Sequence, residues 1–338
     1  MLQNIHRSSD DVAWTESCLR LRDFECTEED YEWWRCHDLD RGHLSEEQKQ
    51  YFENKAVWLC ARCEDVGGRN GRKLAHMAED EKKLVHQIHA LHSSKSAKKH
   101  PSTAFEGLRP VVNLVRGCKV MLTRNVAYKF GLANGTRGVL VGVVYGPDGV
   151  GSFPEACILD VPDYCGPAFY SAQPKWVPIL PKLSLKEGTR MTRRQFPLVA
   201  GFALTVNKAQ GLTIKEGVVI HLVGSRRFRP ASKHGLPFVA WTRSESFHMT
   251  AFKNLPPWGD FVKGKDSDML RMRKALVNRL MTLHQATLAA HSDMKTPEEE
   301  RARFAEWKDA QAQNPKRRKK EQPLLGKCTE CAKWCARA

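Results

Sequence analysis

The segment FPLVAGFALTVNKAQGLTI (196–214), with EGVVIHLV (216–223) after it, decides the fold class of this chain. It consists of an apolar run, a polar turn around NKAQG (207–211) and then the apolar strand VVIHL (218–222). A strand without polar alternation is typical of a parallel sheet that is buried on both faces. We therefore expect an α/β lobe built on a parallel sheet.

Residues 1–104, upstream of this segment, are expected to be mostly helical. Two pairs have the spacing of a capping box, in which a hydroxyl residue and a polar residue three positions later satisfy each other's backbone N–H groups. These pairs are Thr27 with Asp30 and Ser45 with Gln48. Each pair predicts the start of a helix.

The same region contains the first strand that we assign to the lobe. AVWLCAR (56–62) is a short apolar run that predicts a buried strand. Trp33 and Trp34 lie on a charged segment, and we expect them to pack into a core. SSKSAKKH (93–100) has the composition of a basic polar linker.

From residue 105 the sequence changes to strands and turns. Residues 105–137 contain two β-like runs, which we assign to the lobe. Residues 138–195 predict a small β-rich insert, because short apolar runs alternate there with glycine and proline turns. Residues 196–255 then return to the core of the lobe.

The C-terminal part is expected to be a helical extension, residues 256–314, and a tail, residues 315–338. Within the extension, residues 268–291 have apolar positions at helical spacing and predict one long helix. The tail carries eight Lys or Arg and two Glu, a net charge of 8 − 2 = +6. Its PKRRKK run (315–320) fits a nuclear import signal, a DNA-binding tail or a merely solvated run.

Charge points to a polyanionic partner. The 338 residues contain 54 Lys or Arg and 38 Asp or Glu, a net charge of +16. This excess favours nucleic acid ahead of a membrane surface. No apolar run approaches the roughly 18 residues of a membrane helix, and the first residues lack the apolar region of a secretory signal.

The 11 cysteines, an odd number without an export signal, argue for a reducing compartment and against a disulfide framework. The tail has the spacing Cys328-x-x-Cys331-x-x-x-Cys335, and Cys60 and Cys63 form another C-x-x-C pair. A structural zinc ion needs four ligands, and the tail offers three. Free thiols are the simpler interpretation, and a zinc-dependent nucleic-acid adaptor is the alternative.

No local motif gives the chain a self-contained catalytic centre. The phosphate loop GxxxxGK[ST] does not occur, and no acidic pair ends an apolar strand as a magnesium site of this kind requires. The sequence also contains no HExxH motif and no EF-hand loop.

A set of four spaced segments carries a resemblance that covers about residues 20–255. The segments are LCARCEDVGGRNGRKL (59–74), GCKVMLTRNVAYKFGLANGTRGVL (117–140), FPLVAGFALTVNKAQGLTI (196–214) and FVAWTRSES (238–246). In order and spacing they resemble the C-terminal half of the Pif/RecD-type superfamily-one DNA helicases, especially the Helitron-like forms. The resemblance implies a second RecA-like motor lobe of the P-loop NTPase type, with a small β-barrel-like insert and helical extensions at both ends.

The resemblance also implies a nucleotide site, because the family's second lobe closes over ATP and Mg²⁺ held by the first lobe. Arg243 takes the place of the arginine finger, which neutralises charge on the γ-phosphate in the transition state. Arg62 takes the place of an arginine that contacts the nucleotide. Gln210 and Gly211 fall in the loop that senses the γ-phosphate.

The DNA contacts implied by the resemblance fall on Thr205, Lys208 and Thr213, where the family touches the DNA backbone. The insert of 138–195 takes the place of the small barrel that guides single-stranded DNA. The implied partners are therefore single-stranded DNA and junctions between single and double strands.

This chain departs from the family pattern at several positions. Asn207 stands in place of His and cannot titrate, Ala209 in place of Ser or Thr lacks a hydroxyl, and Trp241 replaces Leu. The largest departure is the first lobe, whose phosphate loop and Mg²⁺-binding acids we do not find. We therefore expect a fragment, a degenerate copy or a partner for a first lobe supplied in trans.

Two functions follow as hypotheses. The first is the C-terminal motor lobe of an ATP-dependent helicase that unwinds DNA, 5′ to 3′ by resemblance, in DNA repair, recombination or telomere maintenance. The second is a non-catalytic single-stranded DNA-binding protein derived from such a helicase. The basic run favours a nuclear location, with the mitochondrion as the alternative.

Overall fold

The structure, a computed structural model, describes residues 11–223, 235–291 and 297–312. The chain divides into two compact units, one of residues 2–273 and one of residues 274–338 with Met1. The first unit contains every strand that the structure describes.

A four-stranded parallel sheet forms the centre of the lobe. Its strands, in the order β12-β1-β13-β14, are Ala203–Thr205, Val57–Cys60, Val218–His221 and Thr250–Phe252. All three neighbouring pairs are parallel, and Trp58 of β1 lies opposite both Ala203 and Val219. The α/β lobe expected from the sequence is thus confirmed, and it includes both strands predicted from apolar runs.

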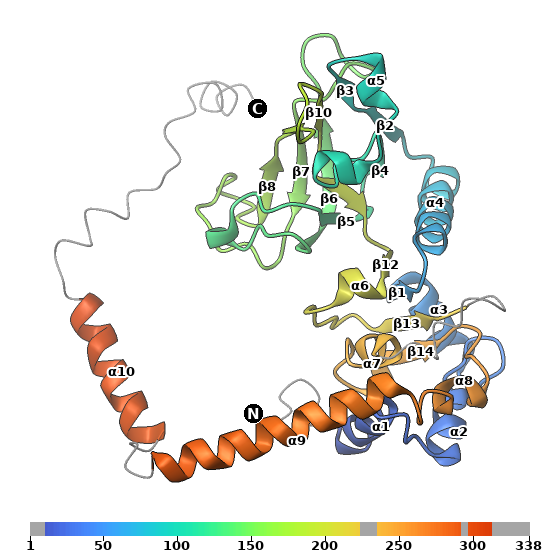
Figure 1. Ribbon diagram of the computed structural model, residues 1–338. Coiled ribbons are helices and arrows are strands. Elements are labelled where there is room, and N and C mark those ends of the chain that lie inside the picture. Colours follow the sequence, from blue (N-terminus) through green and yellow to red (C-terminus); the bar gives the residue numbers. More distant parts are fainter. Residues whose placement is uncertain (1–10, 224–234, 292–296, 313–338) are drawn as a thin grey trace. The chain divides into compact units, whose positions relative to one another are not determined.

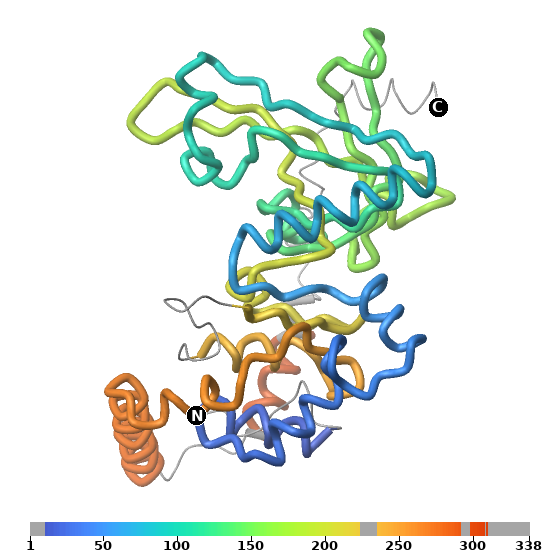
Figure 2. Tube along the Cα trace, turned by 90° about the vertical axis from the view of Figure 1, so that its right-hand side faces the viewer, coloured from blue at the N-terminus to red at the C-terminus, as the bar shows by residue number. Residues whose placement is uncertain are grey.

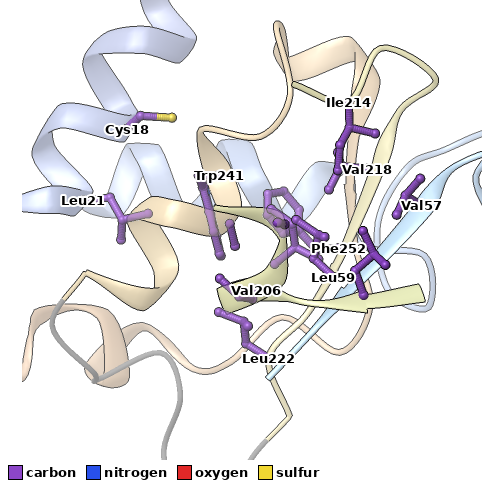
Figure 3. Close-up of a cluster of buried hydrophobic side chains, with 14 of the residues drawn as sticks. Cys18, Leu21, Val57, Leu59, Val206, Ile214, Val218, Leu222, Trp241 and Phe252 are labelled. Atoms are coloured by element: carbon purple, nitrogen blue, oxygen red, sulfur yellow. The ribbon is translucent and has the colours of Figure 1, made fainter. Parts of the chain in front are cut away.

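Both faces of this sheet are buried, which explains why its strands read as unbroken apolar runs. Val57 and Leu59 of β1 point into one hydrophobic cluster, whereas Trp58 and Cys60 point into another on the opposite face. Figure 3 shows the first cluster, in which Val57 and Leu59 meet Phe252 and other apolar side chains from distant segments.

Helices cover the sheet. They are α1 (Val12–Arg22), α2 (Glu28–Cys36), α3 (Glu46–Asn54), α4 (Cys63–Asp80), α6 (Val206–Ala209), α7 (Leu236–Trp241) and α8 (Trp258–Val262). The capping boxes predicted at the starts of α2 and α3 are both present. In Figures 1 and 2 the N-terminal helices lie beside the segment near residue 250.

Aromatic side chains join these two segments. The ring of Trp33 lies 4.2 Å from that of Phe247, and the fully buried Trp34 packs edge-on against Trp241 at 5.5 Å. The expectation that Trp33 and Trp34 pack into a core is confirmed, with Trp34 inside the cluster and the half-buried Trp33 packed against it. Trp241, which replaces the family's leucine, is also fully buried and fills the same core.

Between α4 and β12 lies a β-rich part, residues 85–200, which we call the observed insert. Its largest sheet has the order β11-β5-β6-β7-β8, with strands Leu198–Ala200, Lys119–Leu122, Arg137–Val144, Ala156–Asp160 and Trp176–Ile179. Two smaller sheets pair β2 (Val85–His89) with β4 (Val111–Val115), and β3 (Leu91–His92) with β10 (Thr192–Gln195) and β9 (Lys182–Leu185). Short helices are α5 (Lys95–Lys98), η1 (Ser102–Phe105) and η2 (Tyr128–Phe130).

The observed insert is larger than the predicted one of 138–195. We assigned the strands of 105–137 to the lobe, but β4 pairs with β2 and β5 pairs with β6 and β11, so these strands belong to the insert. An apolar run predicts a strand but does not show which sheet that strand joins. In the region 1–104, the longer helices end at Asp80, and the strands β2 and β3 follow with the short helix α5.

The segment 93–100 is not a linker. Ser94 caps the short helix α5, and Ala97 is fully buried. The carbonyl oxygens of Ala97 and His100 accept hydrogen bonds from the buried guanidinium of Arg193. The basic, polar composition of the segment predicted a linker because it does not show these contacts to backbone carbonyl groups.

The long helix predicted over 268–291 is confirmed as α9 (Asp268–Ala290), and α10 (Pro297–Ala312) follows it. In the first unit, Leu270 of α9 is buried and Arg273 forms an ion pair with Asp23. The tail, with PKRRKK (315–320), lies outside the described residues. No helix in the described part of the chain is both long and apolar enough to span a membrane.

Candidate nucleotide and nucleic-acid site

The carboxyl edge of the parallel sheet brings several candidate residues together. After β1, the next lobe strand in the chain, β12, lies on one side of β1, and the one after it, β13, lies on the other side. The direction of the strand order therefore changes between β1 and β13. Ligands of open α/β sheets bind at the carboxyl ends of strands next to such a switch point. Arg62 follows β1 there, and α6 follows β12 directly.

Helix α6, with its N-cap residue and the turn after it, holds four of the candidate residues, Thr205, Lys208, Gln210 and Gly211. Thr205 is the N-cap of α6, and its Oγ1 accepts a hydrogen bond from the backbone N–H of Lys208 at 3.3 Å. Gln210 ends the helix and is exposed. Gly211 follows with a φ of +88°, a conformation that costs other residues strain. A Cβ at this position would meet no atom within 4 Å, so the glycine is required by the backbone conformation and not by space.

Arg243 fastens this turn. It is 7% exposed, and its Nη1 donates to the carbonyl oxygens of Leu212 at 3.0 Å and Ala209 at 3.4 Å. Its Nε donates to Val239 O at 2.8 Å, and its Nη2 to Thr242 Oγ1 at 2.9 Å. The guanidinium therefore ties the end of α7 to both sides of the Gln210–Gly211 turn.

The backbone of Arg243 strengthens this connection, because its carbonyl oxygen accepts from the N–H of Ile214 at 3.0 Å. Thr213, between these contacts, is exposed. Among the residues that depart from the family pattern, Ala209 is fully buried and Asn207 is exposed. The missing hydroxyl at Ala209 thus leaves an apolar side chain inside the core.

Arg62 is the N-cap residue of α4, and its side chain forms two hydrogen bonds with Asp65, both 2.8 Å long. These bonds raise the pKa of the Arg62 guanidinium. Sequence reasoning missed Asp65, although a carboxylate three residues after an arginine at a helix start is a readable signal. The pair leaves Arg62 exposed to 41% of its side chain.

Two further side chains near this edge, Lys208 and His221, have lowered pKa values. Although Lys208 is exposed, partial desolvation by the surrounding protein, and next the positive charge of Arg109, lowers its pKa. Burial also lowers the pKa of His221 at the end of β13, although Asp65 opposes that change. The Nδ1 of His221 is buried and has no hydrogen-bond partner within the described residues.

Asn70 is a positioning residue that the sequence analysis did not find. Its Nδ2 donates to the carbonyl oxygens of Ala200 at 3.0 Å and Ala203 at 3.2 Å, and its Oδ1 accepts from the Ala203 N–H at 2.8 Å. It therefore joins α4 to the start of β12. The sequence does contain a sign of this role, because Asn70 lies four residues from both Val66 and Leu74 and therefore on the same buried face of α4.

No metal centre is found in the part of the chain that the structure describes, where no three His, Cys, Asp or Glu side chains form a cluster. Cys60 is buried, which raises the pKa of its thiol to about 12, and Cys63 is exposed. Cys328, Cys331 and Cys335 lie outside the described residues.

Comparison with known proteins identifies relatives of this arrangement. No family model matches the chain. The human ATP-dependent DNA helicase PIF1 is 28% identical over 162 residues, which are 47% of this chain and 22% of that protein. The rat helicase of the same name is 29% identical over 162 residues, with the same two shares. The chain thus matches less than a quarter of the length of these relatives.

Solved structures show the same fold. The Pif1 helicase of Candida albicans matches with a TM-score of 0.59 and 21% identity, over 82% of this chain and 60% of that one. A Bacteroides Pif1 helicase in complex with ADP-AlF3 and single-stranded DNA matches with a TM-score of 0.54 and 18% identity, over 81% and 56%. The mixed α/β lobe with helical extensions is therefore the fold of Pif1 helicase motor domains.

Proposed function

Because the chain is related to the Pif1-type superfamily-one helicases, we propose that it acts as the second motor lobe of an ATP-dependent DNA helicase. The observation that carries this proposal is the fastening of Arg243 to the Gln210–Gly211 turn at the carboxyl edge of the sheet. The side chain of the proposed arginine finger thereby holds the loop that is proposed to sense the γ-phosphate.

The charged groups at this edge fit one half of a nucleotide site. Arg243 and Arg62 offer guanidinium groups to phosphate oxygens, and bound ATP would supply the hydrolysable phosphoanhydride. Mg²⁺ needs carboxylates, and Asp65 is occupied by Arg62. The residues that hold Mg²⁺ would therefore come from a first lobe, fused or supplied in trans.

The proposed action of Arg243 is an exchange of partners. Its guanidinium donates to neutral oxygens such as those of Val239 and Leu212, whereas phosphate oxygens carry full charges and bind guanidinium more strongly. When a nucleotide approaches, Arg243 would turn from Ala209 and Leu212 toward the γ-phosphate. The freed turn then has a different conformation in the two nucleotide states.

The proposed DNA contacts lie beside this turn. Lys208 and Thr213 are exposed and can reach a DNA backbone, whereas the hydroxyl of Thr205 caps α6 and positions Lys208. The partners would be single-stranded DNA and its junctions with duplex. Translocation from 5′ to 3′, a role in repair, recombination or telomere maintenance, and a nuclear or mitochondrial location belong to this proposal.

Fusion to a first lobe tests the proposal. With the first lobe of a complete Pif1-type helicase joined ahead of the full chain, we expect ATP hydrolysis that single-stranded DNA stimulates. Arg243→Ala should lower turnover by about 10³-fold, with little change in nucleotide affinity. Arg243→Lys should not restore it, because an ammonium group cannot present a planar pair of donors.

Arg35→Ala is the matched control, since Arg35 is an exposed arginine paired only with Glu32 in the described part, and its loss should leave turnover unchanged. Because Arg243 also fastens the turn, the melting temperature of each variant is measured alongside turnover. A folded fusion protein that hydrolyses ATP equally well with and without Arg243 would refute the assignment.

A second function is favoured by two features of the sequence, the absence of GxxxxGK[ST] and the net charge of +16. On this alternative the chain binds single-stranded DNA without catalysis. Both proposals expect DNA binding by the isolated chain, and neither expects it to hydrolyse ATP. They differ in the fusion protein, which stays inactive if the lobe has lost its motor role.

A further inference from the structure

The three-stranded sheet β3-β10-β9 is built with polar residues inside and leucines outside. Its inner face carries Arg193 and Gln195, which are fully buried, and Ser184, which is 3% exposed. Its outer face carries Leu91, Leu183 and Leu185, which are 48%, 64% and 57% exposed. This is the reverse of the usual pattern for a sheet with one solvated face. Strands β3 and β10 are labelled in Figure 1.

Hydrogen bonds fix this orientation. Arg193 donates to the carbonyl oxygens of Leu108 at 2.8 Å and His100 at 2.8 Å, and its guanidinium lies 4.3 Å from the centre of the Phe105 ring. Gln195 donates to Ile88 O at 3.0 Å. A register slip of one residue would bring the leucines inside but leave these carbonyl groups unpaired. The outward leucines are therefore a fixed feature of the sheet.

Strand β9 is also an edge. In the described part of the chain it pairs only with β10, with Leu183 opposite Arg194 and Leu185 opposite Thr192. An edge strand presents backbone N–H and C=O groups that can template another strand. Natural proteins usually blunt such edges, and here the exposed leucines have the opposite effect.

The surroundings of β9 are basic. Apart from the buried Arg193, the chain from Lys182 to Arg194 has four Lys or Arg and a single Glu, a net charge of 4 − 1 = +3. Arg194, which lies opposite Leu183, and Arg190, in the turn between β9 and β10, are both exposed. The charge excludes the basic tail of this chain as an occupant and favours an acidic one.

We propose that the outer face and free edge of β9 form a docking site for an extended acidic peptide segment of a partner protein. The segment adds to β9 as a fourth strand, with apolar residues at alternate positions on the face of Leu183 and Leu185 and the acidic residues between them on the face of Lys182. The exposed Arg190 and Arg194 add positive charge near this edge. Leucines favour a peptide over single-stranded nucleic acid, whose bases stack on aromatic side chains. This inference does not depend on the motor function.

Fluorescence anisotropy with the full chain tests it. The probe is a labelled twelve-residue peptide in which Leu or Val alternates with Asp or Glu. We expect saturable binding that Leu183→Ser/Leu185→Ser weakens about tenfold or more. Leu276→Ser/Leu280→Ser, which changes two leucines of similar exposure on α9, should leave the affinity unchanged.

Two further probes separate strand addition from general charge attraction. A peptide of the same composition without alternation, and one with methyl groups on alternate backbone nitrogens, should both bind at least about tenfold more weakly. Hydrogen exchange of the amides of Lys182–Leu185 should slow when the alternating peptide binds.

Equal binding of all peptides, or no loss in the Leu183→Ser/Leu185→Ser variant, would overturn the proposal. It would also be overturned if a dT oligonucleotide bound the chain and lost that binding in the same double variant, because the surface would then serve nucleic acid. Retained dT binding in this variant supports a separate peptide site.

Discussion

Asn70 lies in the middle of α4, where its side chain satisfies backbone groups that no neighbouring strand reaches. Its amide spans the carbonyl oxygens of Ala200 and Ala203 and the N–H of Ala203, at the point where the chain returns from the observed insert to the parallel sheet. An amide serves here because it carries donors and an acceptor together.

Asn70→Ala should lower the free energy of unfolding by about 2–4 kcal/mol, since it leaves three buried backbone groups without partners. Urea denaturation of the full chain measures this change. Asn278→Ala, on the exposed surface of α9, is the matched control and should change stability by no more than about 0.5 kcal/mol. A loss of the same small size at Asn70 would contradict the assigned role.

His37 makes the stability of the lobe depend on pH. Its Nδ1 lies 2.8 Å from Thr250 O, and its ring stacks on Phe247 at 3.9 Å between centres. Burial lowers the pKa of His37. The unfolded chain, in which histidine titrates near about 6.5, therefore binds more protons than the folded chain below that pH.

The folded state is therefore not penalised by His37 above about pH 6.5, where the ring is neutral in both states. Its stability falls as the pH drops from there to the lowered pKa of His37 in the folded chain. His37 should contribute a slope of up to about 1.4 kcal/mol per pH unit in that interval. Urea titrations between pH 7.5 and 5 should show a smaller slope for His37→Gln. Leu39→Ala, which destabilises the core without removing a titrating group, should keep the original slope.

At the scale of elements, periodicity and capping predicted local structure but not partners. The runs at β1 and β13 predicted strands because their residues are buried on both faces. Strand β2 was not predicted, because only Ile88 is buried in it and its sequence therefore lacks the regular alternation of apolar and polar residues. The strands of 105–137 were placed in the wrong sheet because pairing depends on contacts distant in sequence, as between Val85 and Val115.

The candidate site could be predicted to a similar extent. The motifs placed Arg243 and the Gln210–Gly211 turn in one family pattern, and the structure shows them in contact. The sequence could not show that Arg243 is buried among carbonyl groups, because those belong to backbone rather than to side chains. The roles of these residues stay predictions.

Helix α9 is expected to stabilise the first unit only through its first turns. Leu270 is 2% exposed and Arg273 pairs with Asp23, whereas later apolar residues such as Leu276 and Leu280 are about half exposed. A chain that ends at Arg273 should melt within about 3 °C of the full chain, because it loses little burial.

A chain that ends at Lys265 is the control, and it should melt about 5–10 °C lower, because it also loses Leu270. Differential scanning calorimetry measures both. Equal destabilisation by the two truncations would mean that residues 274–338 support the first unit.

For the whole molecule, we expect the net charge of +16 to govern the proposed association with nucleic acid. We expect the full chain to bind a dT oligonucleotide weakly and without strong sequence preference, mainly through phosphates. Affinity should fall steeply with salt, by about 0.7 in the logarithm per phosphate contact for each tenfold rise in salt. Fluorescence anisotropy at several salt concentrations gives this slope.

Deleting residues 315–338 should weaken binding without abolishing it, since +6 of the charge lies there. An uncharged peptide nucleic acid of the same base sequence is the control and should not bind. Binding that is independent of salt, or absent at low salt, would show that the charge does not serve this purpose.

The return of the chain from the observed insert to the parallel sheet has a mechanical consequence. Only Gly201 and Phe202 separate β11 from β12, and both are held, by hydrogen bonds from the Gly201 N–H to Lys119 O and from the Trp58 N–H to Phe202 O. Strand β12 then passes directly into α6. Extended chain is already near its full length. We therefore expect a load on the insert along β11 to pass as tension through β12 and α6 to the Gln210–Gly211 turn, with little extension of the connection.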